Sequence, residues 1–244
     1  MATYRERKQR VYRVYAKSHD DDRRRMLGDQ ALTARMTLIA DALSGIGAVL
    51  DLGCGTGDLL YTLGILIGEE ACCVGVDLSP EMLAVAQAKI VDCPHTSVIQ
   101  TDVTQPLPFA DESFDLVASL HLLQEISAPS LVLEEVYRIL KPGGSFRGVA
   151  ACYVGDNAAE MLHQAIARRH TWYFRPAEEM LAMFQQTFPS ATAHFEPFLR
   201  GAYTQAAALP TFPLFAQMIE QVRALGHNPE DVRMGALFLD GKKD

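Results

Sequence analysis

The feature that most constrains this chain is a glycine-rich turn that directly follows a short apolar segment. The run reads V-L-D-L-G-C-G-T-G-D over residues 49–58. The apolar residues predict a buried parallel strand. The turn predicts a loop that a ligand approaches closely, because glycine lacks the side chain that would block it. The following helix would direct its free N–H groups at the same place, so the segment predicts a cradle for a nucleotide-like ligand at the carboxyl end of a strand.

Beyond this turn, strands and helices alternate through the middle of the chain. The expected strands are 48–52, 72–76, 97–100, 114–119 and 145–151, and the expected helices are 58–67, 80–90 and 129–140. Repeated units of this length predict a mostly parallel α/β sheet with helices on both faces. Right-handed crossovers place the carboxyl ends of the strands along one edge, where we expect the site.

The two ends of the chain are less regular. Before the first strand we expect three helices: one over 3–18, one that begins at the acidic run 20–22, and one over 29–43. After the fifth strand we expect helices over 157–170, 176–188 and 213–225. We also expect strands over 193–198 and 234–239. These elements indicate three regions: an N-terminal lid helix region (1–30), a cofactor-binding core (31–152), and a C-terminal part of the sheet with substrate-lid helices (153–244). Alternatively, the extra helices only pack against the sheet and do not contact a substrate.

Composition argues against several classes of function. The 244 residues carry a net charge of −8, whereas nucleic-acid binding usually requires a basic surface, and only the N-terminal stretch is locally basic. No apolar leader is evident, and the longest apolar run, within 59–67, is too short to span a bilayer, so we expect a cytoplasmic protein without a membrane span. The five cysteines include no C-x-x-C pair, which argues against a disulfide scaffold or a zinc knuckle.

Acidic residues follow the second and third expected strands. Asp77 comes 20 positions after the last glycine of the turn, and a carboxylate there can accept hydrogen bonds from both hydroxyls of a ribose. Capping the next helix is its alternative role, but Ser79 and Pro80 already provide that helix start. Asp102 can accept from the exocyclic amine of an adenine, and the Val103 N–H can reach a ring nitrogen. A simple turn role for Asp102 stays open.

Together these segments resemble the class I S-adenosylmethionine (SAM)-dependent methyltransferases. The glycine turn resembles motif I of that family, and its third glycine stands one place earlier than in the dinucleotide fingerprint G-x-G-x-x-G. The series P-L-P-F-x-D-x-S-F-D-x-V at 106–117 is similar to the segment that links motifs II and IV, and L-K-P-G-G at 140–144 is similar to the turn before the fifth strand. The resemblance covers about 48–151 and is greatest to the ubiquinone/menaquinone-biosynthesis type of the methyltransferase 11/25 group.

This resemblance implies a Rossmann-like, seven-stranded sheet with an antiparallel last strand, an α-helical lid, and SAM lying across the strand tips. It implies methyl transfer by direct displacement to a small-molecule oxygen, nitrogen or carbon nucleophile, with S-adenosylhomocysteine as the product. Asp51 would orient the loop and the amino group of the cofactor. The full set of implied cofactor contacts is Tyr15, Asp51, Gly53, Cys54, Gly55, Thr56, Gly57, Asp77, Leu78, Met82, Asp102, Val103 and Ser119.

The sequence indicates fewer residues for binding the methyl acceptor than for binding the cofactor. Tyr15 to Asp20 resembles the Y-A-x-x-Y-D lid of the family, with His19 in place of the second tyrosine. His121 ends the fourth strand and is our candidate for a catalytic base or substrate contact, with a core or rim histidine as the alternative. Further candidates for lining the acceptor pocket are His19, His163, Trp172 and Tyr203. The alternative is that these side chains pack in the protein or are exposed to solvent. His163 and His170 share a helix face, but no carboxylate completes a ligand set, so no metal is expected.

The sequence leaves other functions open. An RNA or protein methyltransferase would need a basic or peptide-binding surface beside the strand tips. A SAM-binding protein that does not methylate would carry the same motifs. A nicotinamide oxidoreductase is a more distant alternative, because the glycine spacing differs. The acceptor is not identified, and a homodimer is one of several oligomeric states left open.

Overall fold

The computed structural model describes residues 4–67, 71–154, 173–197 and 233–244, together with residues 220, 223, 224, 226 and 228. Three helices come first: α1 (Tyr4–Tyr15), α2 (His19–Leu27) and α3 (Asp29–Ala40). The alternating part then contains β1 (Ala48–Leu52), α4 (Asp58–Leu66), β2 (Cys72–Asp77), α5 (Pro80–Lys89), β3 (Thr96–Gln100), β4 (Phe114–Leu120), the short 3-10 helix η1 (Leu123–Glu125), α6 (Pro129–Ile139) and β5 (Leu140–Val154). The last part contains β6 (Arg175–Pro176), α8 (Ala177–Thr187), β7 (Thr192–Pro197) and β8 (Arg233–Lys242).

The strands form one sheet in the order β3-β2-β1-β4-β5-β8-β7, with β6 paired to β5. β1 to β5 are parallel, whereas β8 is antiparallel to both β5 and β7. This confirms the predicted Rossmann-like, mostly parallel sheet with a reversed last strand. The sequence missed β6, which has only two residues. β5 is longer than the predicted 145–151 because it includes the turn before it, where its pairing with β4 shifts register.

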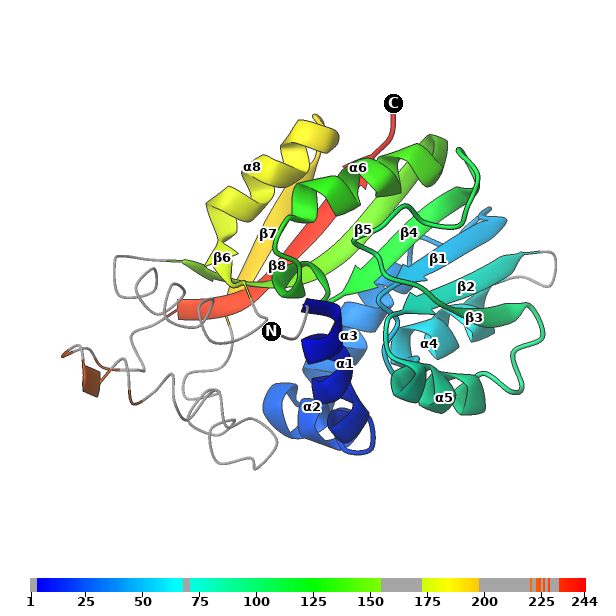
Figure 1. Cartoon of the computed structure of the whole chain (residues 1–244). Coiled ribbons are helices and arrows are strands. Elements are labelled where there is room, and N and C mark those ends of the chain that lie inside the picture. The colour runs from blue at the N-terminus through cyan, green and yellow to red at the C-terminus, as the bar shows by residue number, and fades with distance from the viewer. Residues whose placement is uncertain are drawn as a thin grey trace.

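Each face of the sheet carries its own hydrophobic core (Figure 1). α6 and α8 cover one face, and α3, α4 and α5 cover the other. A parallel sheet requires cover on both faces, because its strands are apolar on both sides. Burying each large apolar side chain contributes about 1.5–3 kcal/mol. Representative fully buried side chains are Leu133, Val136 and Phe184 on the first face and Ile39, Leu60 and Leu63 on the second.

The N-terminal helices lie beside the edge at which the parallel strands end (Figure 1). α2 has Asp20, Asp21 and Asp22 in its first turn, as predicted, since acidic side chains interact favourably with the positive end of the helix dipole. α3 ends at Ala40, earlier than the predicted residue 43. The predicted helix over 157–170 lies outside the described residues, as does most of the one over 213–225. The division into three regions stays a prediction.

In the described part of the chain, every helix is too short or too polar to cross a lipid bilayer.

Candidate functional site

The glycine loop, residues 53–57, links the end of β1 to the start of α4. The backbone N–H groups of Gly53 and Cys54 both donate to the carbonyl oxygen of Val76 at 2.9 Å, which ties the loop to the end of β2. The N–H of Gly55 donates to Oδ2 of Asp77 at 3.0 Å. The loop is therefore held by backbone hydrogen bonds against the neighbouring strand, at the edge where the sequence placed the site.

Two glycines of this loop are required for different reasons. Gly57 has φ of +82°, and a Cβ atom there would lie 2.8 Å from the Cβ and 2.9 Å from the Cα of Ala86, so it allows α4 and α5 to pack closely. Gly55 has φ of +53°, but a Cβ atom there would have no atom within 4 Å. Gly55 therefore presents its bare backbone to open space. This is the position at which a ligand can approach the loop.

Asp77 lies at the tip of β2, where a ribose-binding carboxylate was predicted. Its Oδ1 accepts from the N–H of Ser79 at 2.8 Å, in addition to the bond from Gly55 to Oδ2. Burial raises the pKa of Asp77 to about 6, and these backbone hydrogen bonds limit the rise. The helix-start role belongs to Ser79, whose Oγ accepts from the N–H of Met82 at the beginning of α5. Each carboxylate oxygen of Asp77 still has lone pairs available for hydroxyl donors.

Asp102 lies in the loop after β3, on the same edge of the sheet. Its Oδ1 accepts from both the N–H of Thr104 at 3.1 Å and the hydroxyl of Thr104 at 2.7 Å. This is the turn role that the sequence left open. Oδ2 makes no hydrogen bond to any residue that the structure describes, so a contact of this oxygen with an adenine amine stays a prediction.

Asp51 is a buried carboxyl beneath the glycine loop, only 1% exposed. Its Oδ2 is buried and has no hydrogen-bond partner among the described residues. Burial and the nearby charge of Asp77 raise the pKa of Asp51 to about 8, against the lowering effect of Arg23. At neutral pH, Asp51 is therefore largely protonated, and a cationic ligand group next to it would stabilise its charged form.

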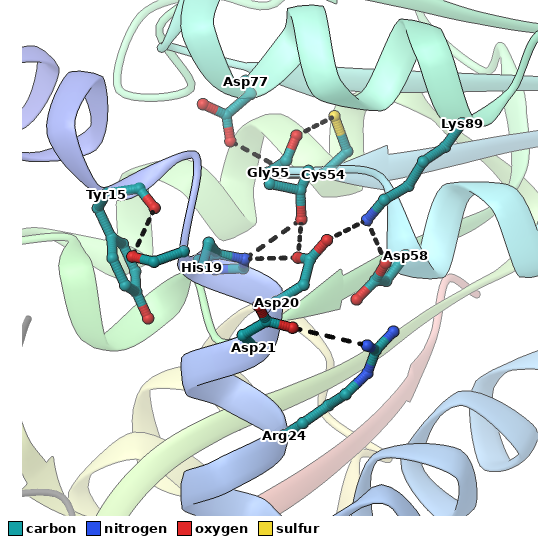
Figure 2. Close-up of polar contacts among 12 residues, drawn as sticks. Tyr15, His19, Asp20, Asp21, Arg24, Cys54, Gly55, Asp58, Asp77 and Lys89 are labelled. Atoms are coloured by element: carbon teal, nitrogen blue, oxygen red, sulfur yellow. Dashed lines mark hydrogen bonds and ion pairs between the residues drawn. The ribbon is translucent and has the colours of Figure 1, made fainter. Parts of the chain in front are cut away.

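The start of α2 is attached to the glycine loop by polar side chains (Figure 2). Thr56 donates from Oγ1 to Oδ1 of Asp20 at 2.5 Å, and Lys89 of α5 donates from Nζ to Oδ2 of Asp20 at 2.5 Å. Lys89 also pairs with Asp58 at the start of α4. Burial raises the pKa of Asp20, but hydrogen bonds from His19, Lys89 and Thr56 outweigh it, so the pKa is lowered. Asp20 therefore stays charged and connects α2 to the glycine loop and to α5.

His19 and Tyr15 lie beside this attachment point. Nδ1 of His19 is 3.0 Å from Oδ1 of Asp20 and 3.2 Å from Oγ1 of Thr56. The ring of Tyr15 packs edge-on against the His19 ring, with a centroid distance of 5.0 Å. The structure thus places His19 at the glycine loop, next to the predicted lid tyrosine. A contact of His19 with substrate stays a prediction.

α1 is attached to the other side of the site through Glu125, which follows β4. Lys8 donates from Nζ to Oε2 of Glu125 at 2.6 Å, and the Tyr12 hydroxyl donates to the same oxygen. Both helices of the lid, which we define as α1 and α2, are thus fixed to the strand edge by charged or hydroxyl groups. The sequence missed Asp20, Lys89 and Glu125. The acidic residue in the Y-A-x-x-Y-D segment was the available signal for Asp20, whereas the other two depend on contacts between distant segments.

His121 stands at the end of β4, as predicted, with φ of +59°. Its N–H donates to the carbonyl of Val149 at 2.7 Å, and its own carbonyl accepts from the Gln124 amide at 2.7 Å, so the backbone is fixed on both sides. Nε2 is buried and has no partner among the described residues. Burial, with the charges of Arg23 and Arg35, lowers the pKa of His121 well below its ordinary value. The imidazole is therefore neutral at physiological pH, and one of its ring nitrogens can accept a hydrogen bond.

Other predicted residues have structural roles in the described part of the chain. The hydroxyl of Ser119 is buried and donates to the carbonyl of Leu52 at 2.9 Å, which joins β4 to β1. Met82 is buried and Leu78 uses its carbonyl to accept from the side chain of Gln100 at 3.1 Å. Cys54 and Val103 are buried as well, with 8% exposure each. Cofactor contacts by these residues stay predictions.

Three predicted acceptor residues, His163, Trp172 and Tyr203, lie outside the described residues. Within the described ranges, no group of three histidine, cysteine, aspartate or glutamate side chains is arranged to hold a metal ion.

Known proteins with a similar sequence or fold indicate which class of protein has this site. Residues 50–147 match the family model described as a methyltransferase domain. Over 100 residues the chain is 35% identical to the demethylmenaquinone methyltransferase of Symbiobacterium thermophilum, and this alignment covers 40% of each chain. The chain thus spans less than half the length of that curated relative.

Solved structures have a similar fold. The structure of Haemonchus contortus phosphoethanolamine N-methyltransferase 2 in complex with phosphomonomethylethanolamine and S-adenosylhomocysteine is similar with a TM-score of 0.75 and 18% identity, covering 100% of this chain and 61% of that one. The [4+2]-cyclase SpnF is similar with a TM-score of 0.72 and 18% identity, covering 99% and 97% of the two chains.

Residues 50–147 thus match a methyltransferase domain, and about half of the chain is similar in sequence to SAM-dependent methyltransferases of the ubiquinone/menaquinone-biosynthesis type.

Proposed function

We propose that the protein transfers the methyl group of SAM to a small-molecule oxygen, nitrogen or carbon nucleophile by direct displacement. The observation that carries this proposal is the convergence of three groups at one sheet edge: the open backbone at Gly55, the carboxylate of Asp77, and the imidazole of His121. The first two fit an adenosyl-amino-acid cofactor. The third lies at the adjacent strand tip, where an acceptor would bind.

The residues present fit SAM in charge as well as in shape. SAM supplies an electrophilic methyl group on a sulfonium sulfur, together with a cationic amino group. Asp51 has a buried Oδ2 without a partner among the described residues, which suits a cationic donor. Asp77 can accept from ribose hydroxyls while its backbone bonds to Gly55 and Ser79 hold it in place. The side chains of the lid can exclude water and fix the orientation of the bound molecules.

His121 is the proposed general base for acceptors whose nucleophile is protonated at neutral pH. Its neutral imidazole and its buried Nε2 allow it to accept a proton at that atom. A positioned base typically contributes about 10²–10⁴-fold to a rate. We therefore expect His121→Asn to reduce methyl transfer to such an acceptor by at least about 100-fold. Asparagine is the suitable replacement, because it tolerates the positive φ at this position.

The direct test is incubation of the protein with methyl-labelled SAM and a metabolite extract, followed by detection of labelled small molecules. We expect label in low-molecular-weight products and none in protein or RNA. Label in RNA or protein would support the macromolecular alternative. Stable binding of SAM without any transfer would support the alternative of a non-methylating SAM-binding protein. The His121→Asn variant is the control, and it should bind S-adenosylhomocysteine within twofold of wild type.

Binding alone can be tested by thermal shift, because a ligand that binds only the folded state raises its stability. We expect SAM and S-adenosylhomocysteine to stabilise the protein and NAD to have no effect. The wider proposal includes a small-molecule partner, no nucleic acid, and a cytoplasmic location, which the five free thiols support. A homodimer is an additional proposal, to be tested by light scattering.

A further inference from the structure

Two arginines of the N-terminal helices are near enough to His121 for their charges to act on it. Arg23 is four residues after His19 in α2, so the two side chains share one helix face, which His19 directs toward the glycine loop. Arg35 of α3 is 5% exposed, and it lies on the same buried face as Leu32 and Ile39. Both helices thus present a guanidinium group to the interior.

Of the two arginines, Arg23 is the stronger candidate for binding an anion. Its Nη2 is buried without a hydrogen-bond partner in the described part of the chain, and no described carboxylate forms an ion pair with it. Its charge acts on groups from several elements: it lowers the pKa of His19 in α2, of Asp51 in β1 and of His121 after β4. The guanidinium therefore lies among the residues that surround the strand tips.

Arg35 is within electrostatic range of both Arg23 and Glu196 of β7. Burial and the charge of Arg23 lower the pKa of Arg35 more than the charge of Glu196, in β7, raises it. Asp51 contributes little negative charge at neutral pH, because its pKa is about 8.

The lack of an ion pair between Arg23 and any described carboxylate contrasts with the composition of the chain. The protein has 30 acidic and 22 basic residues, so acidic side chains are plentiful, yet none of the described ones forms an ion pair with Arg23. Buried charges are stable only when they are paired or hydrogen-bonded. Arg23 is partly exposed, but its Nη2 is buried without a partner among the described residues, so it is suited to a ligand that brings its own anionic oxygen atoms.

We propose that the methyl acceptor carries a carboxylate or phosphate group, which Arg23 binds with the support of Arg35, so that the reacting atom faces His121. This inference rests on the proposed methyltransferase function. The acceptor is the favoured source of the anion because the charges of both arginines act on His121. Asp77, which would hold the ribose of the cofactor, lies at the tip of β2, and β1 separates this strand from β4. The methionine carboxylate of the cofactor is the competing source.

The test compares three variants in the presence of saturating S-adenosylhomocysteine. Arg23→Gln removes the charge, Arg23→Lys keeps the charge without the planar fork, and Arg24→Gln is the matched control. Arg24 is the next residue of α2, and its side chain points away from the site to pair with Asp21 (Figure 2). The probes are benzoate, its neutral analogue benzamide, and inorganic phosphate at constant ionic strength, measured by calorimetry.

Wild type and Arg24→Gln should bind benzoate about tenfold more tightly than benzamide, because only benzoate can form a charge-assisted pair. They should also bind phosphate. Arg23→Gln should lose both the preference and phosphate binding, and Arg23→Lys should keep part of them. Equal affinity for benzoate and benzamide in wild type, no saturable binding of any probe, or a preference that persists in Arg23→Gln would overturn the proposal.

A second measurement separates the two sources of the anion. S-Adenosylhomocysteine has a carboxylate, whereas 5′-methylthioadenosine has none. We expect Arg23→Gln to bind both within twofold of wild type. A tenfold loss for S-adenosylhomocysteine alone would assign Arg23 to the cofactor and overturn the acceptor proposal. If wild type binds neither compound, the methyltransferase proposal itself fails, which is a different result from the loss of anion preference.

Discussion

The glycine loop and the lid contribute to the same site by opposite means. The loop is held by backbone hydrogen bonds to Val76 and Asp77, and its glycines allow close packing and ligand approach. The lid is held by side chains, through Asp20 on one side and Glu125 on the other. A site built from backbone tolerates little change in shape, whereas a site built from charged side chains depends on pH and can open. We therefore expect substitutions in the two regions to differ in both size and kind of effect.

The largest effect is expected at Gly57. Gly57→Ala imposes a left-handed conformation, which costs about 1–2 kcal/mol, and a clash with Ala86 of α5, which costs about 1–3 kcal/mol. Chemical denaturation should show that the free energy of unfolding falls by the sum of these costs. The matched control is Gly55→Ala, where only the conformational cost applies, and it should weaken S-adenosylhomocysteine binding more than it lowers stability. Equal stability losses in the two variants would contradict the distinction between packing and ligand approach.

The next effect concerns Asp51 and pH. Its folded-state pKa of about 8 lies above its ordinary value, so the folded chain keeps a proton that the unfolded chain releases. The stability contributed by this proton is present below about pH 4 and is lost as the pH rises toward 8. Asp51→Asn should remove this decline. Between pH 4 and pH 8, the free energy of unfolding should therefore fall by a few kcal/mol less in the variant than in wild type.

Asp115 provides a control of opposite sign. It accepts from the backbone of Gly47 and Ala48 and from Lys141, and these hydrogen bonds outweigh burial and lower its pKa. Its contribution is present at neutral pH and is lost as the pH falls through the lowered pKa. Asp115→Asn should therefore reduce stability at pH 7. An unchanged pH slope in Asp51→Asn, measured by urea denaturation, would contradict the assignment to Asp51.

A smaller effect is expected at the lid attachment. Asp20→Asn removes the charge that Lys89 and Thr56 stabilise, at a position that is about one-quarter exposed. We expect the opening of α2 to become about 1–2 kcal/mol easier, because each charged hydrogen bond is partly screened by solvent. Amide hydrogen exchange in α2 measures this change. Asp21→Asn, on the exposed side of the same helix turn, should leave exchange unchanged. Similar protection losses in both variants would show that Asp20 has no special role.

The smallest effect is expected at Ser119. Its hydroxyl donates to Leu52 across the β1–β4 pair, so Ser119→Ala should lower the free energy of unfolding by about 1 kcal/mol. Affinity for S-adenosylhomocysteine should stay within twofold of wild type. A tenfold loss of affinity, with little change in stability, would instead show that this side chain serves the cofactor.

The same contrast explains how much the sequence could predict. The glycine loop, Asp77 and the order of strands were readable, because hydrophobic periodicity and turn residues act locally. The roles of Asp20, Lys89 and Glu125 depend on contacts between segments up to 117 residues apart, which no local pattern encodes. Ser119 was placed at the correct strand tip, but which neighbour its hydroxyl contacts depends on the pairing of β4 with β1. Arg23 gave no signal, because a basic residue in a charged helix is ordinarily solvated.

The most direct test of the account is calorimetric titration of wild type and Asp77→Ala with S-adenosylhomocysteine. Asp77 joins the glycine loop to the tip of β2, so both parts of the cofactor site depend on it. Loss of a charged hydrogen-bond acceptor costs about 1.5–3 kcal/mol, which predicts single-site binding in wild type and about ten- to a hundredfold weaker binding in the variant. Absence of binding in wild type, or equal affinity in the two proteins, would contradict the assignment of this edge as a SAM site.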